Sequence, residues 1–231
     1  MKIEKHQETW TGKILNQEFL DCIFNELKVR NADIKNVDFI KVHFKNSYLG
    51  FNTKYTDCTF DSCKFFGKYN SLGRPAYFKN CKFINCNFIG IDLFEGQYFE
   101  ECFISGKIKN AILKDEHPEI KNTQTVFNKC NLTDTIFDNV SIYGKSIFRN
   151  TLLPIKGLRF FKNTDDSLIR RAQEICSQID NDSKIESEII FKTSFKKGQD
   201  PIILDELFLY SFFKTGDSKM IFEEIVTGYE L

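Results

Sequence analysis

The sequence predicts a mainly β protein, in which a β-helix with four-sided turns is followed by a small α-helical segment. Large apolar residues recur at every fifth position across most of residues 14–152, and small residues stand two places before many of them. The period ends at Pro154, where apolar spacings of three and four begin. Because five is the period of neither a helix nor a strand, each five-residue unit is expected to form one side of a coil.

The periodicity is carried by two long runs and two shorter ones. At 42% apolar residues, eight in fixed phase arise by chance about once in a thousand trials, so two such runs indicate a repeat. The inward residues of the first half are expected to be Ile14, Phe19, Phe24, Val29, Ile34, Phe39, Phe44, Leu49, Tyr55, Phe60 and Phe65. Those of the second half are expected to be Phe78, Phe83, Phe88, Leu93, Tyr98, Phe103, Ile108, Leu113, Phe127, Leu132, Phe137, Ile142, Ile147 and Leu152.

Cysteine usage follows the same period. Six of the eight cysteines fall at the small position of the unit, and they are Cys22, Cys58, Cys63, Cys81, Cys86 and Cys130. Since cysteine is small and readily buried, we interpret these residues as inward spacers rather than as disulfide partners or metal ligands.

Individual units resemble the pentapeptide-repeat family, whose consensus is A(D/N)LXX. The best examples are ADIKN at residues 32–36 and CNLTD at residues 130–134. The resemblance covers about residues 12–154 and implies a right-handed quadrilateral β-helix. Counting sides predicts about six to seven coils within residues 1–157.

Two charged residues depart from this pattern, since Glu101 and Lys145 fall at small inward positions. An isolated buried charge is costly, so we expect a slip of one residue near Glu101. Phe99 and Ile104 would then point inward, with Cys102 at the small position.

Two gaps in the period predict loops near residues 66–77 and 114–126. Each gap is counted as one missing side, which places the loops on adjoining faces about 13 Å apart along the axis. The first loop offers Tyr69, Leu72 and Arg74 as a candidate contact set for a partner protein, with a tolerated surface insertion as the alternative. The second loop is charged and contains His117, a further candidate contact.

Residues 158–231 predict four helices. The first follows Asp165 and Asp166 and runs to about Ile179, and the second opens at Asp182. The third opens at Asp200-Pro201 and runs to Gly216, and the fourth ends near Gly228. The third is apolar on nearly every side, so four of its residues form either the centre of a small bundle or a dimer seam: Leu204, Phe208, Phe212 and Phe213.

Both ends of the β-helix are expected to be covered, because an open end exposes unpaired strand edges. The helical segment follows directly after the last coil and would cover that end. Trp10 and the first turn would cover the other.

Composition and motifs give no indication of catalysis. Lys plus Arg and Asp plus Glu balance at 32 each, the three histidines are far apart, and no nucleotide-binding glycine motif is present. We predict no enzyme activity, no cofactor and no metal site. The start, MKIEKHQETW, lacks the apolar core of a secretion signal, and no apolar run is long enough to span a membrane, so we expect a cytoplasmic protein.

The sequence therefore predicts a non-catalytic protein-interaction or scaffold module. It does not identify the protein partner. A homodimer formed through the C-terminal helices is one possible arrangement. The family resemblance also implies an alternative, since one branch binds DNA gyrase by imitating the shape and negative charge of duplex DNA. Residues 1–157 hold 22 Lys and Arg against 18 Asp and Glu, which is the wrong sign for such mimicry. Direct nucleic-acid binding is a third class, but the positive excess is small and no run of basic and aromatic residues supports it.

Overall fold

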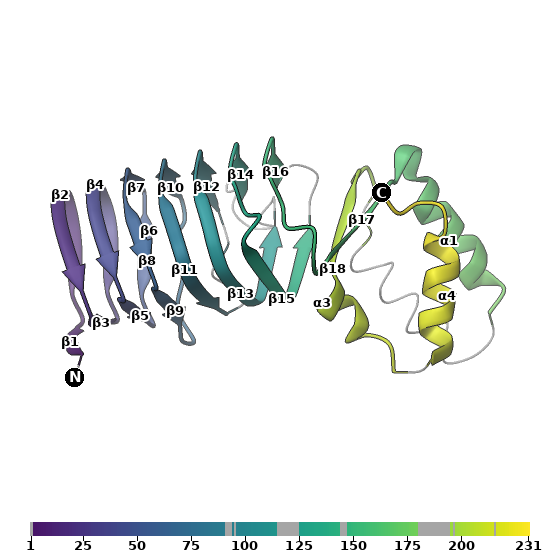
Figure 1. Cartoon of the computed structure of the whole chain (residues 1–231), viewed down its shortest axis with the longest axis horizontal. Helices are drawn as coiled ribbons and strands as arrows, with labels where there is room; N and C mark the ends of the chain where they lie inside the picture. The colour runs from purple at the N-terminus through teal and green to yellow at the C-terminus, as the bar shows by residue number, and fades with distance from the viewer. Residues whose placement is uncertain are drawn as a thin grey trace.

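The chain forms a straight β-rod followed by a smaller α/β unit (Figure 1). We call residues 2–157 the rod and residues 158–231 the tail. The computed structural model describes residues 2–90, 94, 96–114, 125–143, 147–179, 195, 197–214 and 216–231.

The rod is a parallel β-solenoid of about six turns, in which each strand pairs with the equivalent strand one turn away. The mainly β prediction is therefore confirmed. The rod strands are β1 (Ile3–His6), β2 (Thr9–Leu20), β3 (Cys22–Asn25), β4 (Lys28–Ile40), β5 (His43–Lys45), β6 (Tyr48–Phe51), β7 (Thr53–Thr56), β8 (Thr59–Asp61), β9 (Lys64–Phe66), β10 (Ala76–Lys79), β11 (Lys82–Ile89), β12 (Gln97–Glu100), β13 (Phe103–Lys114), β14 (Val126–Asn128), β15 (Thr135–Tyr143) and β16 (Phe148–Arg149).

Four inward rows build the core, one on each side of the solenoid. The ring centroids of Phe60 and Phe83 lie 4.6 Å apart and those of Phe78 and Phe99 lie 4.9 Å apart, close to the spacing of neighbouring strands. Strand pairing therefore also stacks the aromatic rings. The first row is Ile14, Ile34, Tyr55, Phe78, Phe99, Phe127 and Phe148; the second is Phe19, Phe39, Phe60, Phe83 and Ile104; the third is Phe24, Phe44, Phe65, Phe88, Ile108 and Phe137; and the fourth includes Val29, Leu49 and Leu72.

The slip expected near Glu101 is confirmed. Phe99 and Ile104 are each 1% exposed and Cys102 is 2% exposed, whereas Tyr98 and Phe103 are only partly buried. Expecting Tyr98 and Phe103 to point inward was therefore wrong. Leu93 and Lys145 lie outside the described residues.

A left-handed backbone at the corners explains the asparagines and aspartates of the repeat. Asn31, Asn36 and Asn46 have φ values of 47°, 52° and 48°, a conformation that Asn, Asp and Gly adopt at the lowest cost. Glu101 has φ 54° and is exposed at such a corner, so its charge meets water.

The first loop contains a complete side of the solenoid. Ser71 forms a parallel bridge with Tyr48, and Leu72 occupies the fourth inward row. Gly73, at φ +103°, allows this segment to lie directly on the turn below, because a Cβ there would collide with the Gly50 carbonyl.

The second gap does not replace a side, contrary to our prediction. Leu113 pairs with Ile142, and Phe127 pairs with Phe99 in the first row. These residues therefore belong to successive sides, and the extra residues leave the solenoid at the corner between them. Residues 115–124 lie outside the described part of the chain.

The two ends of the rod are closed differently. At the first end, Trp10 stacks on Phe19 with centroids 5.0 Å apart, and the Lys5 ammonium lies 5.4 Å from the Phe24 ring centroid. At the other end the phase slips by one residue, because Leu152 bridges Asn131 with its side chain 60% exposed, while Leu153 packs against the core in place of the predicted Leu152.

The tail contains a two-stranded antiparallel ribbon and helices. The ribbon pairs β17 (Leu158–Phe161) with β18 (Ile202–Asp205), and its Leu158 and Ile203 join the rod core. The ribbon thus covers part of the last turn, where the sequence had predicted helices (Figure 1). The helical elements are η2 (Thr164–Asp166), α1 (Ser167–Ser177), α3 (Glu206–Tyr210) and α4 (Gly216–Val226).

These elements confirm two of the predicted helices and correct a third. The first and fourth predicted helices correspond to α1 and α4. The third does not begin at Asp200-Pro201, since residues 202–205 form β18; the helix starts after Asp205, whose carboxylate accepts the Phe208 amide at 2.7 Å. The segment predicted as the second helix lies mostly outside the described residues.

Candidate interaction surface

The structure separates the residues predicted for the first loop. Tyr69 is 70% exposed, whereas Leu72 is 0% exposed and fills the rod core. Arg74 is partly buried at the other end of that side. Leu72 was therefore wrongly predicted as a contact. The thirteen-residue gap in the period contains one further inward position, which Leu72 occupies out of phase. His117 lies outside the described residues.

The four residues predicted for either a bundle core or a dimer seam pack within the tail. Leu204 is 2% exposed in the tail core, and Phe212 and Phe213 pack against that core. Phe208 contacts Phe212 edge to face, with centroids 4.9 Å apart. Leu204, Phe212 and Phe213 thus belong to the tail core, and Phe208 lies partly buried beside Phe212.

A basic and aromatic surface surrounds the rod corner at Asn31 and Asn52. The amide of Asn52 donates to the Asn31 oxygen at 3.2 Å, so the two turns are tied together at this corner. Strand register brings side chains from separate turns together on the adjoining faces. We call this the corner surface and define it as Lys28, Arg30, Tyr48, Phe51, Lys54, Arg74, Tyr77 and Tyr98.

The aromatic side chains of the corner surface are accessible. Phe51 is 52% exposed and Tyr77 is 46% exposed, and the Tyr77 and Tyr98 ring centroids lie 6.2 Å apart. Arg30, Tyr48 and Phe51 line a hollow of about 360 Å³. The Tyr48 hydroxyl accepts the Arg74 amide at 3.0 Å, which holds this ring against the first loop.

The positive charge of the corner surface is weakly compensated. Lys28, Arg30 and Lys54 form no ion pair within the part of the chain that the structure describes. Elsewhere on the rod, Lys79 pairs with Glu100 at 3.1 Å and Lys109 with Asp138 at 3.3 Å. Among the described residues of these two faces near the corner, Asp33 contributes a carboxylate, next to Lys54 in register.

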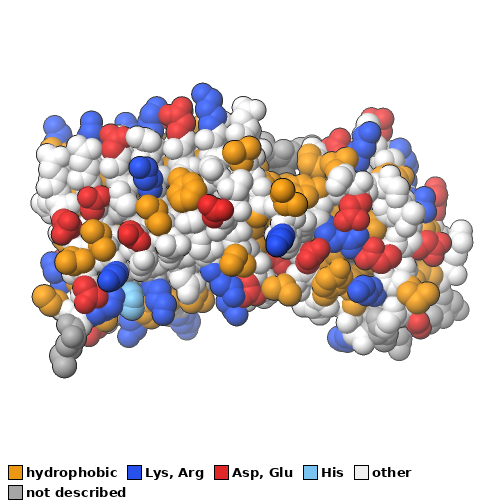
Figure 2. Space-filling view, in the orientation of Figure 1, with side chains coloured by type: hydrophobic (Ala, Val, Ile, Leu, Met, Phe, Trp, Pro, Cys, Tyr) orange, Lys and Arg blue, Asp and Glu red, His pale blue; other side chains and the backbone are white. Residues whose placement is uncertain are grey.

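A different face carries acidic and apolar side chains together. The residues flanking the second inward row include Glu18, Leu20, Asp38, Ile40, Asp61, Lys82, Ile84 and Phe103. Figure 2 likewise shows hydrophobic and acidic side chains interspersed on the rod face turned to the viewer, with lysines and arginines mainly along its upper and lower borders. An interrupted row of this kind differs from the continuous negative charge of duplex DNA.

Seven of the eight cysteines lie in the rod core, and Cys176 lies in the core of the tail. All eight are buried and free, and burial raises the pKa of the Cys86 thiol well above its ordinary value. At Cys86 the thiolate, which is the form that acts as nucleophile and metal ligand, is therefore disfavoured. Within the described residues no group of three or more His, Cys, Asp or Glu side chains is arranged to hold a metal ion.

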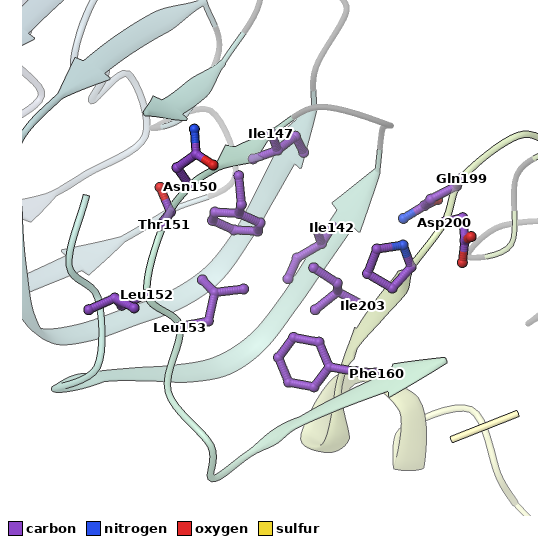
Figure 3. Close-up of a pocket in the computed structure, with 12 residues that line it drawn as sticks. Ile142, Ile147, Asn150, Thr151, Leu152, Leu153, Phe160, Gln199, Asp200 and Ile203 are labelled. Carbon is purple, nitrogen blue, oxygen red and sulfur yellow. The ribbon is translucent and has the colours of Figure 1, made fainter. Parts of the chain in front are cut away.

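A cleft lies where the last turn of the rod meets the tail (Figure 3). Its volume is about 490 Å³. The rod contributes Ile142, Ile147, Phe148, Asn150, Thr151, Leu152 and Leu153, and the tail contributes Phe160, Gln199, Asp200, Pro201 and Ile203.

Comparison with known protein families and with curated proteins gives no match to this chain. The β-solenoid of about six turns is compatible with a pentapeptide-repeat fold. Among the described residues, no helix is both long and apolar enough to cross a membrane.

Proposed function

We propose that the protein is a non-catalytic interaction module of the pentapeptide-repeat type, whose corner surface binds an acidic protein partner. The observation that carries this proposal is a set of three cations that form no ion pair with any described residue, Lys28, Arg30 and Lys54, beside the exposed ring of Phe51. A solenoid scaffold supports such a role because its regular turns hold surface side chains at fixed spacings.

The chemistry of the corner surface suits protein recognition. Arginine and aromatic residues dominate the binding energy of many protein interfaces, particularly where a ring fills a pocket. Unpaired lysines beside them would accelerate encounter with an acidic partner and select against basic ones. Because the side chains project from a paired β-solenoid, little backbone ordering accompanies binding.

Affinity capture from native lysate tests this proposal, with the wild-type chain compared with the double variant Arg30→Ser, Phe51→Ser. We expect the variant to lose a partner that the wild type retains, with affinity at least about tenfold weaker. Binding should also weaken as salt rises from low to physiological concentration, because the lysines are exposed.

A matched control is the double variant Lys64→Ser, Ile136→Ser, which removes one cation and one exposed apolar side chain flanking the third inward row. It should retain the partner. Identical protein sets captured by the wild type and the corner variant would contradict the proposal. Loss of all captured material on nuclease treatment would indicate nucleic acid instead.

Gyrase binding by DNA mimicry is the alternative that the family resemblance implies. The corner surface has the opposite charge, and the acidic side chains of the second face are interleaved with apolar ones, so no observation favours it. A supercoiling assay with gyrase, with and without a quinolone, tests the alternative directly. We expect no effect at excess protein.

Self-association through the tail is a separate proposal with its own test. The exposed apolar residues Leu207 and Met220, at 56% and 71%, are better placed for such contact than the four residues predicted from the sequence. Light scattering of the wild type and of the variant Leu207→Ser, Met220→Ser would reveal it as a fall in mass. A monomeric wild type would exclude a stable dimer.

A further inference from the structure

We infer that the hollow on the corner surface binds an aromatic side chain of the partner, while neighbouring carboxylates of the same segment pair with the surrounding cations. Arg30, Tyr48 and Phe51 line this hollow, whose volume is about 360 Å³. The inference rests on the proposed function and deepens it, because it states which kind of acidic segment the corner surface would recognise.

A β-bulge in β6 creates the hollow. Two successive residues of this strand, Leu49 and Gly50, are buried, whereas a regular strand alternates between its two faces. The pairing of β4 with β6 shifts register at this point, so Tyr48 and Phe51, three residues apart, span only two residues of β4. Bulges of this kind re-aim side chains and occur often beside functional sites.

The bulge is fixed before any partner binds. A Cβ at Gly50 would lie 2.9 Å from the Cβ of Ala76, so the tight approach of the two turns requires glycine here. The Arg74 amide of the first loop donates to the Gly50 carbonyl at 2.7 Å and to the Tyr48 hydroxyl at 3.0 Å. Because the walls of the hollow are already ordered, binding would cost little conformational entropy.

The lining of the hollow favours an aromatic ligand group over an aliphatic one. The Phe51 ring is 52% exposed and Tyr48 is partly buried, so an entering side chain can contact both. An aromatic ring gains from offset or edge-to-face contact with such rings in addition to burial. The Arg30 guanidinium adds a cation–π contribution, which is largest for tryptophan.

The charges around the hollow favour carboxylates beside that aromatic group. Lys28, Arg30 and Lys54 are exposed and form no ion pair with any described residue. Guanidinium can bind a carboxylate through two parallel hydrogen bonds, and the lysines supply further positive charge. An aspartate- and glutamate-rich segment with one aromatic residue therefore matches both the hollow and its surroundings.

A single nucleic-acid strand matches the corner surface less well. Proteins that bind such strands combine a continuous basic groove with successive open stacking platforms. Here Asp33 lies opposite Lys54 in register and interrupts the positive charge. The Tyr77 and Tyr98 rings contact each other, with centroids 6.2 Å apart, so they form one joint surface rather than separate platforms.

Fluorescence anisotropy of the full chain with a labelled peptide of sequence GDEWEDG tests the inference, because this probe places one aromatic side chain between carboxylates. We expect saturable binding of one peptide per chain. Replacing the tryptophan by serine should weaken binding about five- to tenfold. Replacing the acidic residues by their amides should weaken binding at least about tenfold at low salt, and this loss should shrink as salt rises.

Two variants separate the aromatic contact from the charges. Phe51→Ser should abolish the preference for the tryptophan peptide over the serine peptide. The double variant Lys28→Ser, Lys54→Ser should retain that preference but bind the acidic peptide and its amide form more nearly alike. The control Lys64→Ser, Ile136→Ser should bind all peptides as the wild type does, with circular dichroism confirming the fold of each variant.

Equal affinity of the wild type for the tryptophan and serine peptides would overturn the inference, as would a preference that Phe51→Ser leaves unchanged. If no peptide binds while the variant Arg30→Ser, Phe51→Ser still loses its lysate partner, the inference fails and the proposed function stands. If no peptide binds and lysate capture is also unchanged, both fail. A labelled oligothymidylate that binds more tightly than the tryptophan peptide would show that the hollow stacks on bases, which also contradicts the inference.

Discussion

The rod and the tail reach stable packing by opposite routes. In the rod, each turn repeats one local rule, and residues about one turn apart stack directly, as Phe65 and Phe88 do with centroids 4.7 Å apart. In the tail, Arg159 of β17 binds Glu223 of α4 and Glu230 near the chain end, which are 64 and 71 residues away. The contrast teaches that a periodic core can be predicted from local sequence, whereas a core assembled by distant contacts cannot.

The largest loss of stability is expected in a comparison of two neighbouring residues of the rod, Ile104 and Phe103. Ile104→Ala should destabilise the fold by about 2–5 kcal/mol, because Ile104 is fully buried. Phe103→Ala should cost less than about 1 kcal/mol, because the Phe103 side chain lies outside the core. Urea denaturation of both variants measures the difference, and the reverse order would show that the inward phase has been misassigned.

Replacing Arg159, which binds two glutamates, should destabilise the tail more than the rod. Arg159 is 8% exposed, and its Nη1 lies 2.7 Å from a Glu223 oxygen while its Nε lies 2.8 Å from a Glu230 oxygen. Arg159→Met should cost about 1–3 kcal/mol, since both carboxylates lose a charged hydrogen-bond donor but remain partly hydrated.

Hydrogen exchange by mass spectrometry checks this prediction. Amides of α4 should exchange faster in Arg159→Met, while those of β7 and β10 should be unchanged. The exposed Arg170 provides a matched control, and Arg170→Met should leave both regions at wild-type rates. Faster exchange throughout the rod would show that rod and tail unfold as one unit.

A smaller effect concerns Asp205, which is buried at the junction and caps α3. Asp205→Ala removes the acceptor for the Phe208 amide and should cost about 1–2 kcal/mol. Asp205→Asn keeps an acceptor and removes a charge that burial disfavours, so it should be as stable as the wild type at neutral pH. Thermal unfolding of both variants measures the effect, and equal losses would contradict it.

The stabilities of the wild type and of Asp205→Asn should depend differently on pH, because burial raises the pKa of Asp205 above its ordinary value. The folded state therefore binds this proton more tightly than the unfolded state, and the wild type gains stability as pH falls through that window. Any advantage of Asp205→Asn at neutral pH should accordingly shrink on acidification.

The smallest effect is expected from Glu230, whose pKa is lowered by the Arg159 guanidinium. A lowered folded-state pKa stabilises the fold above the ordinary glutamate value, and this contribution is lost as pH falls through the lowered one. Protection of the last residues, meaning their exchange rate relative to the intrinsic rate at the same pH, should fall on acidification below about pH 4. In Glu230→Gln this protection should be the same at neutral and acidic pH, and a pH response equal to that of the wild type would contradict the assignment.

The sequence predicted the solenoid because its rule is local. Tyr55, Phe60 and Phe83 are each buried where the five-residue phase placed them. It also predicted the slip near Glu101, because burying that charge is costly. Leu72 was not predicted to point inward, because the loop between Phe65 and Phe78 places this side chain out of the five-residue phase. Its position depends on the bridge between Tyr48 and Ser71 in another turn.

The tail shows why local pattern was insufficient there. Residues 202–204 are apolar and lie beside good helix formers, yet residues 202–205 form β18 because β17 pairs with them across more than forty residues. Such tertiary pairing overrides local preference.

The sequence by itself determined the repeating turn, its inward rows and the polar corners, because sterics and burial act within each five-residue unit. Only the tertiary structure decided which outward side chains become neighbours. Stacking of turns places Arg30 beside Phe51 and Tyr77 beside Tyr98, and docking of the ribbon on the last turn brings Leu158 and Ile203 into the rod core. These contacts join residues from separate turns and units, so no local pattern in the sequence records them.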